Sequence, residues 1–227
     1  MNIYSHLVLA NEIKPYIRPE NDEEYYWGAI IPDIRNLVGM RRSQTHLSSE
    51  QILSYLSRYP ELHSFLQGYL VHCLTDELDL VSIFATKFPF FLVKKKLTAQ
   101  HYPMILELFY LEQKSIATHT ISGRHNPMLD ALRITPEQSL MYYQLVSEYL
   151  ANPSFEAAIL LIQNLGNISS QRIDRYLVSA RHFQANRVLK GLLFLGIRAG
   201  KIHTQLVEAV LSASQSSFGS RMQVIKP

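Results

Sequence analysis

Apolar residues recur at helical spacing along the chain, and this periodicity limits the folds open to it more than any other feature. Positions i, i+3, i+4 and i+7 are apolar in residues 52–59, 62–69 and 173–180. Residues spaced in this way line one face of an α-helix. Alternating strand patterns are few, and glycine is scarce at 9 of 227 residues. The pattern predicts an all-α fold with no sheet of more than two short strands.

Capping residues indicate where the helices begin and end. Thr135-Pro136-Glu137, for example, combines an N-cap threonine with a proline at the first helical position. We expect one multi-helix domain over 1–227, with a metal-site half at 1–117, a second helical half at 118–211 and a loose tail at 212–227. The predicted helices are 6–17, 22–31, 49–58, 61–86, 98–117, 136–151, 153–165, 170–197 and 201–214.

Composition and charge exclude several classes of protein. The net charge is only +3, and the basic residues are scattered apart from residues 94–96, so no strong nucleic-acid-binding surface is indicated. Cys73 is the single cysteine, which excludes an intrachain disulfide and fits a reducing compartment. Neither a signal peptide nor an apolar run of about 18 residues is visible. We expect a cytoplasmic protein without a transmembrane segment, and its oligomeric state stays open.

The strongest chemical signal is a histidine and an aspartate in the predicted helix 61–86. At about 100° per residue, His72 and Asp76 project from nearly the same side of the helix and can chelate one ion. Both lie at the edge of the apolar stripe that contains Tyr69 and Cys73, so both should face the interior. A buried carboxylate is costly unless it is paired or bound to metal. A metal site and a His–Asp hydrogen bond inside the core explain this pair equally well.

Three earlier residues carry ligand atoms of the same kind. Asp33 follows an apolar run and a proline, His46 stands just before a predicted helix, and His6 begins an apolar segment. Taken singly, Asp33 also fits a turn or cap residue, and His46 a surface-loop histidine. Taken with His72 and Asp76, they form a set of nitrogen and oxygen ligands that suits zinc or another divalent metal ion.

The segments 26–34, 45–46 and 68–76 resemble the zinc-dependent phospholipase C family, which is related in fold to the single-strand-specific zinc nucleases. That family has an early histidine, a G-x-x-x-P-D element, a histidine before a helix, and a G-x-x-x-H-x-x-x-D helix. The matching positions, all within residues 1–80, are His6, Asp33, His46, His72 and Asp76. The resemblance implies an all-helical fold with these residues as metal ligands, Asp33 and Asp76 as catalytic residues, and hydrolysis of a phosphoester by metal-activated water.

The chain also departs from that family. Full members hold three zinc ions, with ligands from a further histidine and a later H-x-x-x-E helix, and they use the tryptophan left at the N-terminus after signal cleavage. No H-x-x-x-E element follows Asp76 here, and the first residue is Met1. We therefore expect a site for one or two metal ions, with loss of activity as an alternative.

The loop 118–135 and the segment before His46 offer additional candidates. His119 and His125 are possible additional ligands, and Arg41, Arg42 and Arg124 are candidates for phosphate binding. For each of these residues, a solvated position on the surface is the alternative interpretation.

The leading hypothesis is a metal-dependent hydrolase of a phosphoester, with a phospholipid head group, a nucleotide and a small phosphate ester all open as substrates. The alternative is a non-catalytic helical interaction protein with a structural or vestigial metal site. A catalytic site keeps an open coordination position, whereas protein ligands close a structural one. A histidine–aspartate phosphohydrolase of another helical family ranks lower, because the chain contains no adjacent His-Asp pair.

Overall fold

The computed structural model describes residues 3–90, 97, 101–113, 120–166, 174, 177–178, 181–183 and 185–218. Within these ranges every regular element is a helix and no strand occurs, which confirms the all-α prediction. Among the described residues, none of the helices has the length and apolar character of a membrane span. The elements are α1 (Ile3–Ile17), α2 (Asp22–Gly28), η1 (Ile31–Ile34), α3 (Arg35–Val38), α4 (Arg42–Thr45), α5 (Ser49–Arg58), η2 (Pro60–Leu62), α6 (His63–Glu77), α7 (Leu80–Lys87), α9 (His101–Gln113), α10 (Pro127–Ala131), α11 (Pro136–Ala151), α12 (Phe155–Asn164), α14 (Arg187–Ala199) and α15 (Ile202–Phe218).

The predicted helix bounds are correct where capping residues mark the start of a helix. They are wrong where the backbone breaks within a continuous apolar pattern. Helices α5 and α11 have the predicted bounds, and each begins with a capping box. The predicted helix 61–86 is instead two helices, because the backbone is extended at Leu78 and the side chain of Asp79 caps α7 by accepting from Ser82 N. The predicted helix 22–31 ends at Gly28, and Pro32 lies in the short helix η1 that follows.

The C-terminal third contains two further differences. Asn186 caps α14 through Leu189 N, so the predicted helix 170–197 is interrupted there. Helix α15 continues to Phe218, so the loose tail predicted from residue 212 is wrong for residues 212–218. Its buried face, which includes Val210 and Ser214, packs into the core and explains the longer helix. Predictions for residues 91–96, 98–100, 114–119, 167–173, 175–176, 179–180, 184 and 219–227, which include parts of the predicted helices 98–117 and 170–197, lie outside the described residues.

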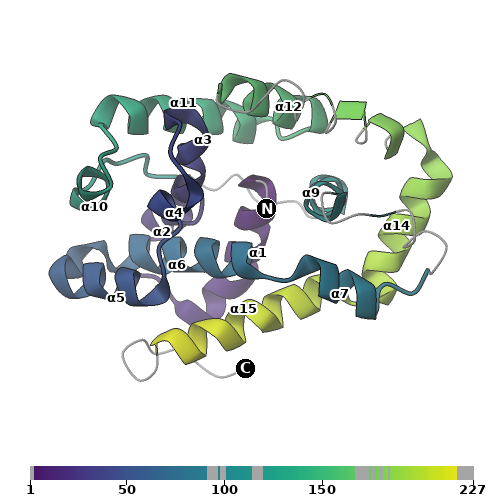
Figure 1. Cartoon of the computed structure of the whole chain (residues 1–227), viewed down its shortest axis with the longest axis horizontal. Coiled ribbons are helices and arrows are strands. Elements are labelled where there is room, and N and C mark those ends of the chain that lie inside the picture. Colours follow the sequence, from purple (N-terminus) through teal and green to yellow (C-terminus); the bar gives the residue numbers. More distant parts are fainter. Residues whose placement is uncertain are drawn as a thin grey trace.

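Helix α6 lies at the centre of the arrangement (Figure 1). It contacts α1, α2, α5 and α15, and α2 is its closest partner. Helices α11 and α12 run along one side of the molecule and α15 crosses the other, as Figure 1 shows. Buried apolar side chains from all of these helices form one continuous core. The pair His72 and Asp76 therefore lies on a helix that packs against four others.

The crossing of α2 and α6 depends on two glycines. A Cβ atom on Gly68 would overlap the carbonyl oxygen of Tyr25, and one on Gly28 would overlap the carbonyl oxygen of Phe65. Because no side chain fits between them, the two backbones are in direct contact. The glycines are those of the G-x-x-x-P-D and G-x-x-x-H-x-x-x-D segments. Their contact brings the end of α2, and the η1 helix that follows, beside the second half of α6.

Candidate metal centre

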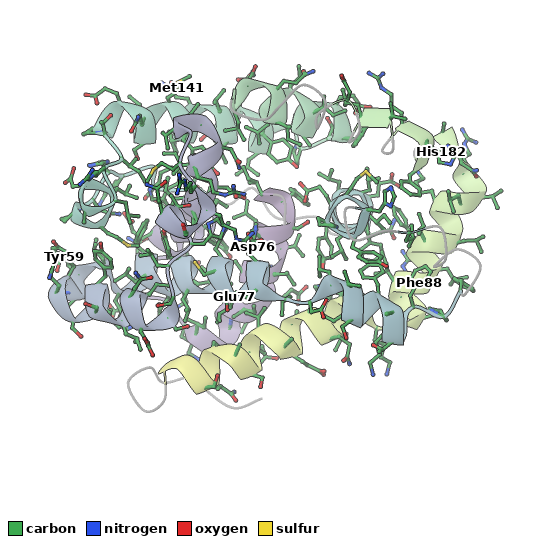
Figure 2. The ribbon with its side chains drawn as sticks, in the orientation of Figure 1. Tyr59, Asp76, Glu77, Phe88, Met141 and His182 are labelled. Carbon is green, nitrogen blue, oxygen red and sulfur yellow. The ribbon has the colours of Figure 1, made fainter. Side chains whose placement is uncertain are left out.

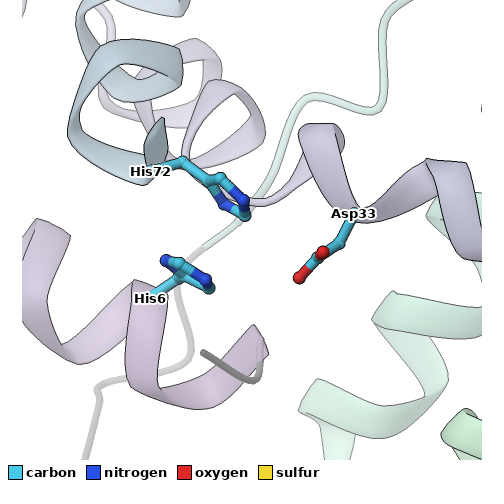
Figure 3. A group of neighbouring side chains, drawn as sticks. All are labelled: His6, Asp33 and His72. Carbon is cyan, nitrogen blue, oxygen red and sulfur yellow. The ribbon is translucent and has the colours of Figure 1, made fainter. Parts of the chain in front are cut away.

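The structure brings together the five histidine and aspartate residues that the sequence singled out. They form two groups in which the ligand atoms lie within 4.8 Å of one another: His6, Asp33 and His72, and His46, His72 and Asp76. Figure 3 shows His6, Asp33 and His72 pointing toward one another from three separate elements. Figure 2 places Asp76 at the end of α6 near the middle of the molecule, and its side chain is 3% exposed.

His72 is held in the form that binds metal. Its Nδ1 lies 2.8 Å from the carbonyl oxygen of Ala29, to which it can only donate. Burial lowers the pKa of His72 to about 3, so the ring is neutral at pH 7. A neutral ring with its proton on Nδ1 presents a lone pair on Nε2. A hydrogen bond from the other ring nitrogen to a backbone carbonyl is the usual support of a metal-ligating histidine.

Three of the distances between donor atoms fall within the range found around a metal ion. His46 Nε2 lies 3.2 Å from His72 Nε2 and 3.0 Å from Asp76 Oδ2, while His6 Nε2 lies 3.2 Å from Asp76 Oδ1. Atoms bound to one zinc ion at about 2.0–2.2 Å are separated by roughly 3.0–3.5 Å. The two carboxylate oxygens of Asp76 therefore face different histidines at coordination spacing.

His6 provides independent support for a cation. It is 1% exposed and stacks on His72 with ring centroids 3.8 Å apart. Its Nε2 contacts Asp76 Oδ1 without hydrogen-bond geometry, and neither ring nitrogen has a hydrogen bond to any residue that the structure describes. Burial, and then the neighbouring His72, lowers the pKa of His6 to about 3. A buried polar atom without a partner costs about 1–3 kcal/mol. A bound ion would satisfy the Nε2 atom, so the donor set fits zinc or another divalent metal.

The two carboxylates supply the charge that a divalent ion requires. Burial acts to raise the pKa of Asp76, but the hydrogen bond with His46 and the close contact with His6 hold that pKa well below its usual range. Arg42 Nη1 lies 3.0 Å from Asp76 Oδ2, and its Nη2 donates to the Asp76 carbonyl. Arg35 Nε lies 3.7 Å from Asp33 Oδ1. Each carboxylate thus has an arginine beside it.

Other predicted candidates lie elsewhere. His125 Nε2 is 2.8 Å from Asp130 Oδ1, and both His125 and Arg124 line a pocket with Asn21 and Glu61. Neither belongs to the two histidine–aspartate groups. Arg41 is an exposed residue at the start of α4, and His119 lies outside the described residues. Of the three predicted phosphate-binding arginines, only Arg42 contacts one of the five residues in the described part of the chain.

Glu107 in α9 is a supporting residue that the sequence reasoning missed. Its carboxylate is 1% exposed and accepts hydrogen bonds from Tyr4 N, Ser5 N, Ser5 Oγ and Tyr149 Oη at 2.5–3.3 Å. It therefore caps the first turn of α1 and fixes the residue before His6. The available signal was a lone charge inside the apolar run 104–110.

Tyrosine hydroxyl groups fix the backbone beside two other candidate ligands. Tyr142 in α11 donates to the carbonyl oxygen of Ile30 at 2.9 Å, three residues before Asp33. Tyr69 in α6 donates to the carbonyl oxygen of Thr45, directly before His46. Side chains from both halves of the chain therefore hold the candidate ligands in place.

The two buried histidines predict how stability depends on pH. The pKa values of His6 and His72 are near 3 in the folded protein and near 6.5 in the unfolded chain. As the pH falls, the unfolded chain therefore takes up protons at a higher pH than the folded protein does. We expect the free energy of unfolding of metal-free protein to decrease below pH 6.5, by roughly 1 kcal/mol per pH unit for each histidine. Urea unfolding between pH 7 and 4.5 in chelator measures this slope. His72→Gln should flatten it and the exposed-site control His182→Gln should not; equal slopes in all three proteins would contradict the prediction.

Comparison with known proteins found no relative of this chain: no family model, curated protein or solved structure matches it.

Proposed function

We propose that this protein is a metal-dependent hydrolase of a phosphoester, with the fold and chemistry of the zinc-dependent phospholipase C family. The observation that carries the proposal is the convergence of three imidazole rings and two carboxylates in two overlapping groups, each with ligand atoms within 4.8 Å of one another. Their order along the chain, with His72 and Asp76 one helical turn apart, is the order of the resembling family. Zinc or another divalent ion is the proposed cofactor.

The five residues would share the work of such a site. His6, His46 and His72 would supply neutral nitrogen ligands, and Asp33 and Asp76 would supply the negative charge. A divalent ion held there lowers the pKa of water and neutralises charge on a phosphate. Asp33, which is 6% exposed, is the carboxylate that we propose to accept the proton of the attacking water.

Arg42 is the residue best placed to meet the substrate. Its side chain is 48% exposed, and both of its terminal nitrogens lie beside Asp76, with Nη1 3.0 Å from Oδ2 and Nη2 donating to the backbone carbonyl. A guanidinium group offers several N–H donors in one plane, which suits a phosphate oxygen pair. The proposed substrate is a phosphoester, either a small molecule or a lipid head group.

One observation favours a second candidate, a non-catalytic helical interaction protein with a structural or vestigial metal site. His6 is 1% exposed and His72 is fully buried, as is expected of ligands that close around an ion. The two candidates agree on metal binding and differ in whether an open position remains for water and substrate.

Metal content and hydrolysis, measured on the same protein, separate these candidates. We expect protein loaded with zinc or manganese to retain stoichiometric metal after gel filtration. It should then hydrolyse p-nitrophenyl phosphate or bis(p-nitrophenyl) phosphate slowly, and a chelator should abolish the activity. Metal retention with no hydrolysis would favour the structural site. A protein that takes up neither metal would contradict both candidates.

A further inference from the structure

A second polar pocket lies between α4, α5 and α10, at the end of the molecule where α5 and α10 are found in Figure 1. Its volume is about 500 Å³, within the range of small-molecule sites. Its polar lining includes Ser43, Gln44, Gln51, Ser54, Arg58 and Arg133, and none of the acidic residues that the structure describes lines it. The pocket is therefore rich in hydrogen-bond donors and positively charged.

In Gln44 and Gln51 the amide oxygen is used for helix capping, and the NH₂ group is left to donate. Gln44 Oε1 accepts from Arg41 N at 2.8 Å, and Gln51 Oε1 accepts from Ser48 N at 2.9 Å. These bonds belong to the capping boxes of α4 and α5. Because each amide oxygen is occupied at a helix start, what each side chain still offers is its NH₂ group. The capping boxes thus fix the polarity of the pocket wall.

Two arginines, Arg58 and Arg133, add positive charge to the pocket. Neither Arg58 nor Arg133 forms an ion pair with any residue in the described part of the chain. Arg133 has φ 62°, a left-handed conformation that favours glycine, and it follows α10 with its N–H bonded to the Asp130 carbonyl. Residue 133 is therefore an arginine in a backbone conformation that glycine adopts more easily, and it lines the pocket.

We propose that this pocket binds a small polyanion that carries phosphate groups. Guanidinium groups bind phosphate through paired N–H donors, and the glutamine NH₂ groups and serine hydroxyls can complete the set. The site is distinct from the candidate metal centre, because none of the five candidate ligands lines the pocket. The proposal does not depend on the proposed hydrolase.

Calorimetric titration of metal-free protein with inorganic pyrophosphate, in chelator and at constant ionic strength, tests the proposal. We expect saturable binding to wild type and to Asp76→Asn, which impairs the candidate metal centre. Arg58→Gln and Arg133→Gly should each weaken binding about tenfold or more, because a hydrogen bond to a charged group is worth about 1.5–3 kcal/mol. The exposed-site control Arg187→Gln in α14 should bind as wild type does.

Arg133→Gly separates lost binding from lost folding. Glycine accepts the left-handed backbone at residue 133 without strain, so this variant should unfold at the same temperature as wild type or higher. Wild-type affinity in Arg58→Gln and Arg133→Gly, or no saturable binding by wild type, would overturn the proposal. Binding lost in Asp76→Asn but kept in the arginine variants would assign the anion to the metal centre and would also overturn it, while leaving the proposed hydrolase intact.

Discussion

Replacing Gly68 with alanine should destabilise the protein by more than about 3 kcal/mol, a large part of the total stability of a typical domain. The new Cβ would overlap the carbonyl oxygen of Tyr25, and its other near neighbours are also backbone atoms, Tyr25 C in α2 and Ala29 N directly after it. A flexible side chain could move aside, but a helix backbone cannot without displacing the rest of its helix. Overpacking of ordinary core sites costs about 1–3 kcal/mol, so a backbone overlap should cost more.

Gly191 provides the matched control. It also lies within a helix, α14, but a Cβ there would have no neighbour within 4 Å in the part of the chain that the structure describes. Gly191→Ala should be neutral or should stabilise the protein by about 0.5–1 kcal/mol, because alanine loses less conformational entropy on folding. Urea unfolding of both variants beside wild type measures the difference. Similar stabilities for Gly68→Ala and Gly191→Ala would show that α2 and α6 do not cross as described.

The same substitution should also affect the candidate metal centre. The contact at Gly28 and Gly68 brings the carbonyl oxygen of Ala29 to within 2.8 Å of His72 Nδ1. Moving the two helices apart would release that hydrogen bond and the proton position that it fixes. The two glycines of the sequence motifs thus support the ligands through backbone contact, without a side chain of their own.

The sequence predicted those parts of the fold that depend on neighbours along the chain. Thr135 caps α11 through Gln138, three residues away, so the start of that helix can be read locally. The break between α6 and α7 was missed because the apolar pattern continues through Leu80 and Phe84 while a single residue, Asp79, starts the new helix. Periodicity reports which face is buried, but it does not report a change of helix axis.

The candidate site shows the same division between local and distant information. The spacing of His72 and Asp76 on one helix predicted that they share a face, and the motif order predicted their other neighbours. Glu107 binds the backbone of Ser5 across 102 residues of sequence, and Tyr142 reaches Ile30 across 112. Such contacts depend on how helices from the two halves pack, which no local pattern encodes.

Replacing Asp76 with asparagine should reduce metal affinity by at least about tenfold and abolish any phosphoester hydrolysis, while the protein still folds. Asp76 faces His6 through Oδ1 and His46 through Oδ2, so one carboxylate serves both sides of the candidate centre. Asparagine keeps the shape but removes the negative charge, which is the main attraction that this residue offers to a cation. Loss of more than 1.4 kcal/mol of that attraction corresponds to the tenfold change.

The fold should survive because the groups around Asp76 tolerate a neutral partner. His46 Nε2 can still donate to the amide oxygen at this position, and Arg42 is 48% exposed and can be solvated. The control is Asp79→Asn, three residues along the chain, because asparagine caps a helix as well as aspartate does. Zinc titration with a competing chelator, elemental analysis and the phosphoesterase assay should distinguish the two variants. Equal zinc affinity in wild type, Asp76→Asn and Asp79→Asn would mean that these residues form a metal-free hydrogen-bonded cluster inside the core.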